Sequence, residues 1–276
     1  MIGQIILNQI DFYKLLDVKV YTIEEYKSLG KEPEILFWVG CAGSFDSRAQ
    51  KITWALVKIL HNAGIEFAVL GNDESCTGDP ARRSGNEFVF QMSALQNIET
   101  LNMYNVNKIV TTCPHCFNTL KNEYPELGGN YDVVHHTQLI QQLINEKRIS
   151  IEKGEFKGKK IVYHDSCYLG RINGIYEGPR NILEELDGQV VEARRNTSKG
   201  LCCGAGGAQM FKEEEPGNKK LNVERVEELL ESNPDIIAVN CPYCTLMMDD
   251  GLKNKEKDED VMVYDISELI VQANNW

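Results

Sequence analysis

The nine cysteines of this 276-residue chain occur in the same order in its two halves. A first cysteine is followed 35 residues later by one or two more, and a Cys-Pro-x-Cys motif comes after another 36 or 37 intervening residues. The corresponding segments are Cys41 with Cys167, Ser75-Cys76-Thr77-Gly78 with Cys202-Cys203-Gly204, and residues 113–116 with residues 241–244. Cysteines that recur at a nearly constant offset indicate two equivalent units in one chain.

Short apolar runs of strand length alternate with segments whose apolar residues have helical spacing. Strands separated by helices are typical of βαβ crossovers, which build parallel sheets. We therefore predict an α/β protein with two tandem Rossmann-like repeats, at residues 33–153 and 154–276, and an N-terminal helical extension over residues 1–32. The expected strands are 34–39, 65–70, 108–110, 131–135, 160–163, 189–192, 236–239 and 261–264; the expected helices are 49–63, 88–103, 178–186 and 221–231. In the second of these helices, Phe88, Phe90 and Met92 are expected to belong to the core.

Composition argues against several classes of function. The chain has 41 acidic and 29 basic residues and a formal charge of −12, whereas nucleic-acid phosphates are bound by clustered Lys and Arg. The longest uninterrupted apolar run, residues 35–39, is far shorter than the ~20 residues that cross a bilayer. The N-terminus has no basic stretch before its apolar residues and so does not resemble a signal peptide. We expect a cytoplasmic protein, or one peripheral on the cytoplasmic side of a membrane, that binds no nucleic acid and is not itself membrane-spanning.

The cysteines point to metal chemistry. In a reducing compartment such a set is more often metal-binding or catalytic than disulfide-forming, and an odd count also argues against closed disulfide pairing. Every cysteine follows a predicted strand, and ligands of parallel sheets bind beyond the carboxyl ends of the strands. A Cys-x-x-Cys motif supplies two thiolates from one turn, and distant loops supply the others.

The adjacent pair Cys202-Cys203 favours a cluster over a single ion, because neighbouring side chains diverge and seldom reach the same metal. Three glycines follow closely, at positions 204, 206 and 207. Their backbone N–H groups can hydrogen-bond to sulfides, which influences the reduction potential of a cluster.

The pattern Cys-x(34)-Cys-Cys-Gly…Cys-Pro-Tyr-Cys, from Cys167 to Cys244, resembles the CCG, or cysteine-rich, domain. That domain occurs twice in the B-type subunit of heterodisulfide reductase, and in iron–sulfur subunits of glycolate, lactate and glycerol-3-phosphate oxidation systems. The resemblance extends from residue 34 to about residue 270. It implies a noncubane [4Fe–4S] cluster beside Gly204, with five cysteine ligands: Cys167, Cys202, Cys203, Cys241 and Cys244.

The first half departs from this pattern, since Ser75 stands where the second half has Cys202. Its remaining thiols are Cys41, Cys76, Cys113 and Cys116. Four thiolates suit a [4Fe–4S] cubane, a structural zinc site, or a modified cluster in which Ser75 or Asp79 takes the fifth position.

The resemblance implies an iron–sulfur oxidoreductase that is a subunit of a larger complex and transfers electrons through its clusters. No ferredoxin-type cysteine run is present. We therefore expect a membrane-associated ferredoxin-type iron–sulfur subunit, a flavoprotein, or both as partners, with quinone or a disulfide as acceptor. The segment Ile2–Leu16, apolar at helical spacing, is expected to dock one of them. Two alternatives are a stand-alone disulfide reductase and a non-enzymatic zinc-binding scaffold.

Three histidine positions have two interpretations each. His164, with Asp165, precedes Cys167 closely and could orient a thiolate or move a proton, or could be a satisfied residue at a strand end. His115, inside the first Cys-Pro-x-Cys motif, could hydrogen-bond a sulfur. The pair at 135–136 is expected to pack or cap rather than to bind a metal.

Metal analysis of protein purified without oxygen separates the cofactor alternatives. Two four-iron clusters correspond to about eight irons per chain. Zinc together with about four irons would assign zinc to the first half. A colourless protein without acid-labile sulfide would contradict an iron–sulfur protein altogether. The measurement is iron, zinc and sulfide content together with EPR.

Overall fold

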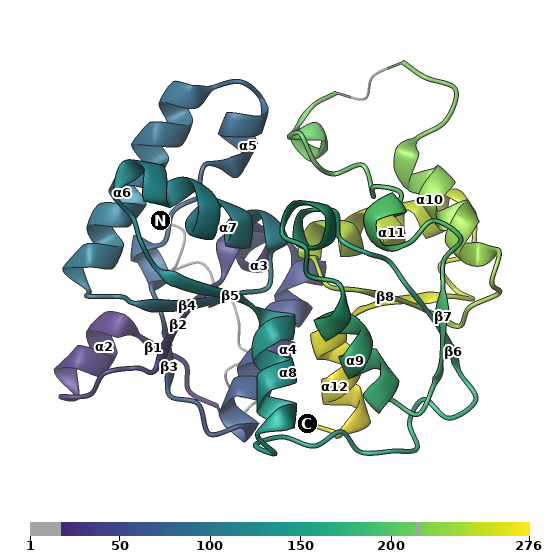
Figure 1. Ribbon diagram of the computed structural model, residues 1–276, viewed down its shortest axis with the longest axis horizontal. Coiled ribbons are helices and arrows are strands. Elements are labelled where there is room, and N and C mark those ends of the chain that lie inside the picture. Colours follow the sequence, from purple (N-terminus) through teal and green to yellow (C-terminus); the bar gives the residue numbers. More distant parts are fainter. Residues whose placement is uncertain (1–17, 214–215) are drawn as a thin grey trace.

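The computed structural model describes residues 18–213 and 216–276, in which strands and helices alternate along the chain (Figure 1). The strands of the first half are β1 (Tyr21–Thr22), β2 (Ile35–Trp38), β3 (Phe67–Val69), β4 (Lys108–Thr111) and β5 (Asp132–His135). Its helices are α2 (Ile23–Ser28), α3 (Gly40–Phe45), α4 (Ser47–Asn62), α5 (Asp79–Arg83), α6 (Glu87–Met103), α7 (Pro114–Asn118) and α8 (His136–Asn145).

The second half has the strands β6 (Lys160–Tyr163), β7 (Gln189–Glu192), β8 (Ile236–Val239) and β9 (Met262–Asp265). Its helices are α9 (Glu177–Glu185), α10 (Leu221–Leu230), α11 (Pro242–Asn254) and α12 (Ile266–Ala273). A short π-helical turn, η5 (Tyr168–Ile172), follows Cys167.

The two sheets confirm the predicted α/β class. Their strand orders are β1-β3-β2-β4-β5 and β7-β6-β8-β9, and every pair of neighbouring strands is parallel. Without the edge strand β1 the two orders are the same, with β2 equivalent to β6 and β4 equivalent to β8. The repeat seen in the cysteines is therefore also a repeat of topology.

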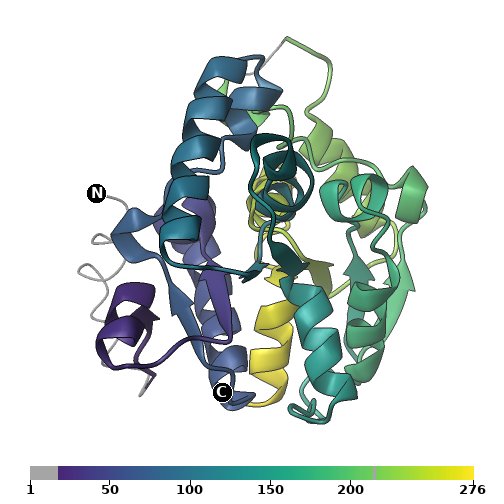
Figure 2. The same cartoon turned by 60° about the vertical axis from the view of Figure 1, so that its left-hand side comes forward.

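The strands β2, β3 and β8 are apolar throughout because helices cover both faces of each sheet. In β2, Leu36 and Trp38 belong to one buried cluster, and Ile35 and Phe37 to the other, as the alternation of a strand requires. The first cluster includes cysteines of both halves, and the second lies among α4, α8, α9 and α12 (Figure 2). Both clusters continue from one half into the other.

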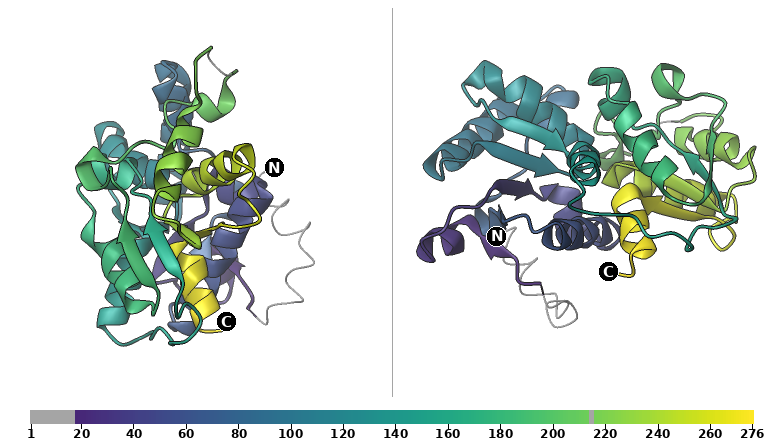
Figure 3. Two further views of the ribbon diagram at one scale, coloured as in Figure 1. Left: turned by 90° about the vertical axis from the view of Figure 1, so that its right-hand side faces the viewer. Right: turned by 60° about the horizontal axis from the view of Figure 1, so that its bottom comes forward.

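The halves pack about an approximate twofold axis. Helix α4 packs on α12, and the equivalent helix α9 packs on α8 (Figure 3). In the same way α7 contacts η5, and α11 contacts α3. Polar contacts join the halves as well: Arg48 donates to Glu268 at 2.7 Å, and His136 Nε2 lies 3.1 Å from Asp265 Oδ1. This symmetry brings the helices that begin at the two Cys-Pro-x-Cys motifs to the centre of the molecule.

Within the predicted N-terminal helical extension, Thr22 caps the short helix α2, and β1 directly before this helix pairs with β3 at the sheet edge. One expectation needs correction. Phe88 and Met92 are not core residues: they are 74% and 56% exposed, and only Phe90 on the opposite side of α6 is buried. Residues 1–17, which include the expected docking segment, lie outside the described residues. Within the described part of the chain, no helix combines the length and the apolar character needed to cross a bilayer.

The packing of α10 on α11 predicts a stability change. A Cβ atom at Gly251 would lie 2.6 Å from Val226 Cγ2 and 3.0 Å from Asn222 O, so Gly251→Ala overpacks this contact. We expect a net loss of about 1–2 kcal/mol in the free energy of unfolding, measured by denaturant titration.

The matched control is Gly178→Ala in α9, where an added Cβ meets nothing within 4 Å. This change should leave stability unaltered or raise it by up to ~1 kcal/mol, because alanine favours the helix. Equal effects of the two substitutions would contradict the packing described.

Candidate metal centre

All nine cysteines lie beyond the carboxyl ends of parallel strands. In each sheet the order of the strands changes direction between the two central strands, β2 and β4 in one sheet and β6 and β8 in the other. The connections that follow these two strands run to opposite sides of the sheet and leave a crevice between them. Cys113 is the residue before α7 and Cys241 the residue before α11, so each Cys-Pro-x-Cys motif begins at such a crevice.

The second half brings its five thiols together as two close pairs. Cys167 Sγ lies 4.0 Å from Cys202 Sγ, and Cys244 Sγ lies 3.4 Å from Cys203 Sγ. The adjacent thiols of Cys202 and Cys203 thus have different partners, and a hydrogen bond between these two thiols joins the pairs. Cys241 completes the set, hydrogen-bonded to Cys244.

The Gly204 turn supports this arrangement. Its backbone N–H donates to Cys202 Sγ at 3.3 Å, and its φ of 92° lies in the left-handed region that favours glycine. Hydrogen bonds from Cys167 and Cys203 lower the pKa of Cys202 to about 2. A thiol held as thiolate is the form that binds metals.

The first half has the same geometry with one substitution. Cys76 is hydrogen-bonded to Cys41, as Cys202 is to Cys167, and it accepts from the N–H of Gly78 at 3.5 Å. Gly78 has a φ of 88°, almost that of Gly204.

These contacts correct the alignment made from the sequence. The loop geometry pairs Cys76 with Cys202, and therefore Thr77, not Ser75, with Cys203. Thr77 Oγ1 lies 3.9 Å from Cys116 Sγ, where the second half has the Cys203–Cys244 contact. Sequence alone left a one-residue ambiguity because the two loops share only short stretches of identity, and the glycine turns resolve it.

The two thiol sets touch at the centre of the molecule. Cys113 and Cys241 are hydrogen-bonded to each other across the approximate twofold axis, and both are buried. Burial raises the pKa of Cys113, but hydrogen bonds from Cys116 and Cys241 outweigh it and hold this pKa well below its ordinary value.

The middle residues of the two motifs cross into the opposite half. Tyr243 of the second motif lies with its hydroxyl 3.0 Å from Cys41 Sγ in the first half. His115 of the first motif stacks on Tyr168 in the second half at a centroid distance of 3.9 Å. Each motif thus places its middle side chain in contact with a residue of the other repeat.

His115 contacts a carboxylate in this region. Its Nδ1 lies 2.9 Å from Asp79 Oδ2, and Arg83 donates to the other oxygen of the same carboxylate at 3.0 Å. Burial lowers the pKa of His115, but the contact with Asp79 and the charge of Cys113 outweigh it and raise that pKa. Both oxygens of Asp79 are therefore already engaged, which disfavours this carboxylate as a fifth ligand.

His164 lies beside the second set. The ring is buried, and its nearest nitrogen, Cys203 Sγ and Cys244 Sγ all lie within 4.8 Å of one another. Burial and the nearby charge of Arg225 lower the pKa of His164 to about 3, so the ring is neutral. The pair at 135–136 packs and caps as expected: His135 caps α8, and His136 Nε2 lies 3.1 Å from Asp265 Oδ1.

Sequence reasoning missed Glu74. This buried carboxylate accepts hydrogen bonds from the backbone N–H groups of Val39 at 3.0 Å and Gly40 at 2.6 Å, directly before Cys41. Burial raises its pKa to about 7. An isolated glutamate in a loop has no sequence pattern that indicates this role.

The donor set fits an iron–sulfur group. All nine cysteines are free thiols despite their close approach. A structural zinc ion takes about four ligands, whereas the second half offers five thiols linked by hydrogen bonds, which suits a cluster with several metal positions. The four thiols of the first half suit a cubane or a zinc ion equally.

Comparison with known proteins agrees with this chemistry. The profile of the cysteine-rich domain, CCG, matches residues 35–121 and 161–249, two segments that contain all nine cysteines. The chain belongs to the CCG cysteine-rich domain family. Each half of the molecule is one CCG repeat, as the resemblance of its motifs indicated.

Three curated relatives are named as oxidoreductases or as a reductase subunit, and one of these names includes iron–sulfur binding. The chain is 45% identical to the EtfAB:quinone oxidoreductase of Syntrophomonas wolfei over 88% of its own length and 35% of the relative. It is 46% identical to the probable iron–sulfur-binding oxidoreductase FadF of Bacillus subtilis, over 93% and 36%. It is 34% identical to the D-type subunit of the dihydromethanophenazine:CoB–CoM heterodisulfide reductase of Methanosarcina barkeri, over 87% and 59%. The chain thus spans between a third and three fifths of the length of these relatives.

The environment of Glu74 predicts a pH dependence of stability. A carboxyl group whose pKa rises from 4.5 to about 7 on folding favours the protonated state in the folded protein. Its contribution therefore falls as pH rises from about 4.5 to 7, by up to about 3 kcal/mol in the free energy of unfolding. Glu74→Gln should remove this dependence, measured by denaturant titration across that pH range.

The exposed Glu99→Gln serves as the control and should retain the wild-type dependence. If the unfolding free energy of Glu74→Gln changed with pH as that of the wild type does, Glu74 would not be the source of the pH dependence.

Proposed function

We propose that the two CCG repeats form an iron–sulfur electron-transfer unit of a larger oxidoreductase, with one metal centre in each repeat. One observation carries this proposal: the two thiol sets converge from separate sheets and touch at Cys113 and Cys241. Electron transfer requires short gaps between centres, and this contact supplies one. The names of the relatives add support, because they describe iron–sulfur binding, quinone reduction and disulfide reduction.

In the second repeat, five thiolates are proposed to hold a noncubane [4Fe–4S] cluster: Cys167, Cys202, Cys203, Cys241 and Cys244. The number of thiols, one more than a zinc ion or a cubane needs, supports a cluster with several metal positions. When bound, such a cluster accepts and releases single electrons. The chain contributes the thiolates, the N–H of Gly204 and a largely buried environment.

In the first repeat, a [4Fe–4S] cubane on Cys41, Cys76, Cys113 and Cys116 is the proposed centre. The position equivalent to Cys203 is a threonine, and Asp79 is bound by His115 and Arg83. Four thiolates match the number that a cubane needs.

Burial suggests the route of electrons. Five cysteines are buried in the interior, whereas Cys41, Cys76, Cys167 and Cys202 are partly exposed, two in each repeat. Each set therefore extends from the centre of the molecule towards its surface. We propose that electrons enter at one repeat and leave at the other. The partners proposed are a flavoprotein and a membrane-associated ferredoxin-type iron–sulfur protein, with quinone as acceptor.

A reciprocal exchange of Thr77 and Cys203 tests both cluster assignments. Cys203→Thr gives the second repeat the side chain of the first and should abolish the EPR signal of its noncubane cluster, because one iron loses its thiolate. The signal of the first repeat should persist. Thr77→Cys supplies a fifth thiol beside Cys116 and should change the signal of the first repeat towards that of the second.

Exchange of Ser75 for cysteine is the matched control, since the loop geometry does not pair it with Cys203, and it should alter neither signal. If a folded Cys203→Thr variant lost both signals, separate centres would be contradicted. If both of its signals were unchanged, the ligand role of Cys203 would be contradicted. Wild-type protein that contains no acid-labile sulfide would contradict the function itself.

A further inference from the structure

The neighbourhood of His164 contains a hydrogen-bond donor without an acceptor. His164 Nδ1 lies 3.0 Å from Arg225 Nε, and His164 Nε2 has no partner although the ring is 1% exposed. Two sulfurs lie close to the ring: Cys203 Sγ, Cys244 Sγ and one of the two ring nitrogens are all within 4.8 Å of one another. A buried polar nitrogen without a partner costs free energy unless something absent from the protein chain satisfies it.

The contact with Arg225 decides where the imidazole proton lies. A guanidinium group only donates hydrogen bonds, so His164 Nδ1 must accept and therefore has no proton. A neutral imidazole has one N–H, and that N–H must then be at Nε2. In this tautomer Nε2 has no free lone pair, so it can donate to a sulfur but cannot bind a metal.

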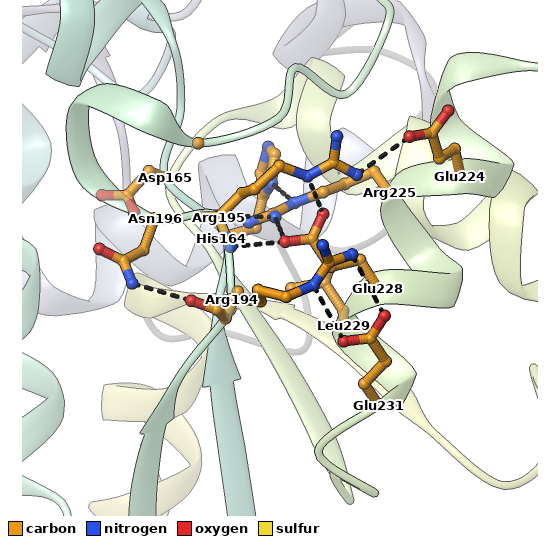
Figure 4. A network of polar contacts seen from close by, with 12 residues as sticks. His164, Asp165, Arg194, Arg195, Asn196, Glu224, Arg225, Glu228, Leu229 and Glu231 are labelled. Carbon is orange, nitrogen blue, oxygen red and sulfur yellow. Dashed lines mark hydrogen bonds and ion pairs between the residues drawn. The ribbon is translucent and has the colours of Figure 1, made fainter.

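The orientation of Arg225 is itself fixed by the fold. Arg225 is fully buried in α10, and its Nη1 donates to the carbonyl oxygen of Arg195 at 2.9 Å (Figure 4). Glu228, one turn further along α10, lies 3.5 Å from the same nitrogen and accepts from Arg195 N and Arg195 Nε, each at 2.6 Å. Backbone and side-chain contacts thus hold the guanidinium group against His164.

The duplication repeats this feature in the first half. Trp38 occupies the position in β2 that is equivalent to His164, three residues before Cys41 as His164 is before Cys167. The indole ring is fully buried, and Trp38 Nε1 has no partner either. An indole nitrogen can only donate. Two different ring types therefore present an unpaired N–H at equivalent positions, which indicates that the donor, rather than the ring, is what both halves have in common.

We propose that His164, oriented by Arg225, is a hydrogen-bond donor to a sulfur of the second centre and not one of its metal ligands. The inference rests on the proposed function, since it needs a cluster in the second repeat. Hydrogen bonds to the sulfurs stabilise the more negative, reduced state of a cluster and so raise its reduction potential. His164 is thus a residue that tunes the potential of the second centre.

Potentiometric titration of the second-centre EPR signal tests the proposal on the full chain. His164→Leu removes the donor and should shift the midpoint potential to a more negative value. His164→Gln keeps an N–H at the end of a side chain of similar reach and should stay closer to the wild type. The control is His136→Leu, a buried histidine paired with Asp265, which should leave the potential unchanged.

Pulsed EPR of protein labelled with ¹⁵N-histidine gives a second readout that needs no variant to fold. A weak nitrogen coupling, together with a proton coupling that disappears in D₂O, is the expected result. A strong nitrogen coupling, as for a directly bound imidazole, would overturn the inference, and so would the absence of any histidine coupling. An unchanged potential in a fully loaded His164→Leu would also overturn it. Protein without any cluster would instead contradict the proposed function, so the two failures are distinguishable.

Discussion

The contact between Cys113 and Cys241 is the constraint on which the rest of the structure depends. Each of these cysteines ends a buried strand and begins a helix, so their positions are set by two separate parallel sheets. For the two to touch, the sheets must present their carboxyl ends to one another. The pairing of α4 with α12 and of α8 with α9 holds the repeats in this orientation, because those helices bury one continuous apolar cluster.

The approximate symmetry also explains why each repeat is incomplete without the other. Tyr243 contacts Cys41, and His115 reaches into the second half, so the surroundings of each thiol set include a side chain from the opposite repeat. The sequence differences at these crossing points make the two sets chemically unequal. The first motif has an imidazole that contacts Asp79, and the second has a phenol that contacts Cys41. In addition, a threonine replaces one cysteine in the first half. The two repeats thus share one architecture, and a few sequence differences make their two thiol sets chemically distinct.

Buried polar groups beside the thiols follow a common principle. A charged or hydrogen-bonding group in an apolar interior is costly unless it has a partner. Arg225 finds the carbonyl oxygen of Arg195, Glu228 and the ring of His164, and Glu74 finds two backbone N–H groups. The partnerless ring nitrogens of Trp38 and His164 are among the exceptions to this rule, and these two residues lie three positions before the first cysteine of each set.

The sequence by itself determined the α/β class, the two repeats, most strand and helix positions, and the placement of every cysteine after a strand. These features follow from local periodicity and from the spacing of residues in the chain. It misplaced Phe88 and Met92, because an apolar residue in a helix can face either side. It also aligned Ser75 with Cys202, because two short loops offer more than one register. Only the tertiary structure decided that Thr77 replaces Cys203, that Glu74 supports Cys41, and that Arg225 selects the tautomer of His164. These relations join residues that are 34 to 61 positions apart, or that belong to different repeats, and contacts over such separations arise from the packing of sheets and helices rather than from any local pattern.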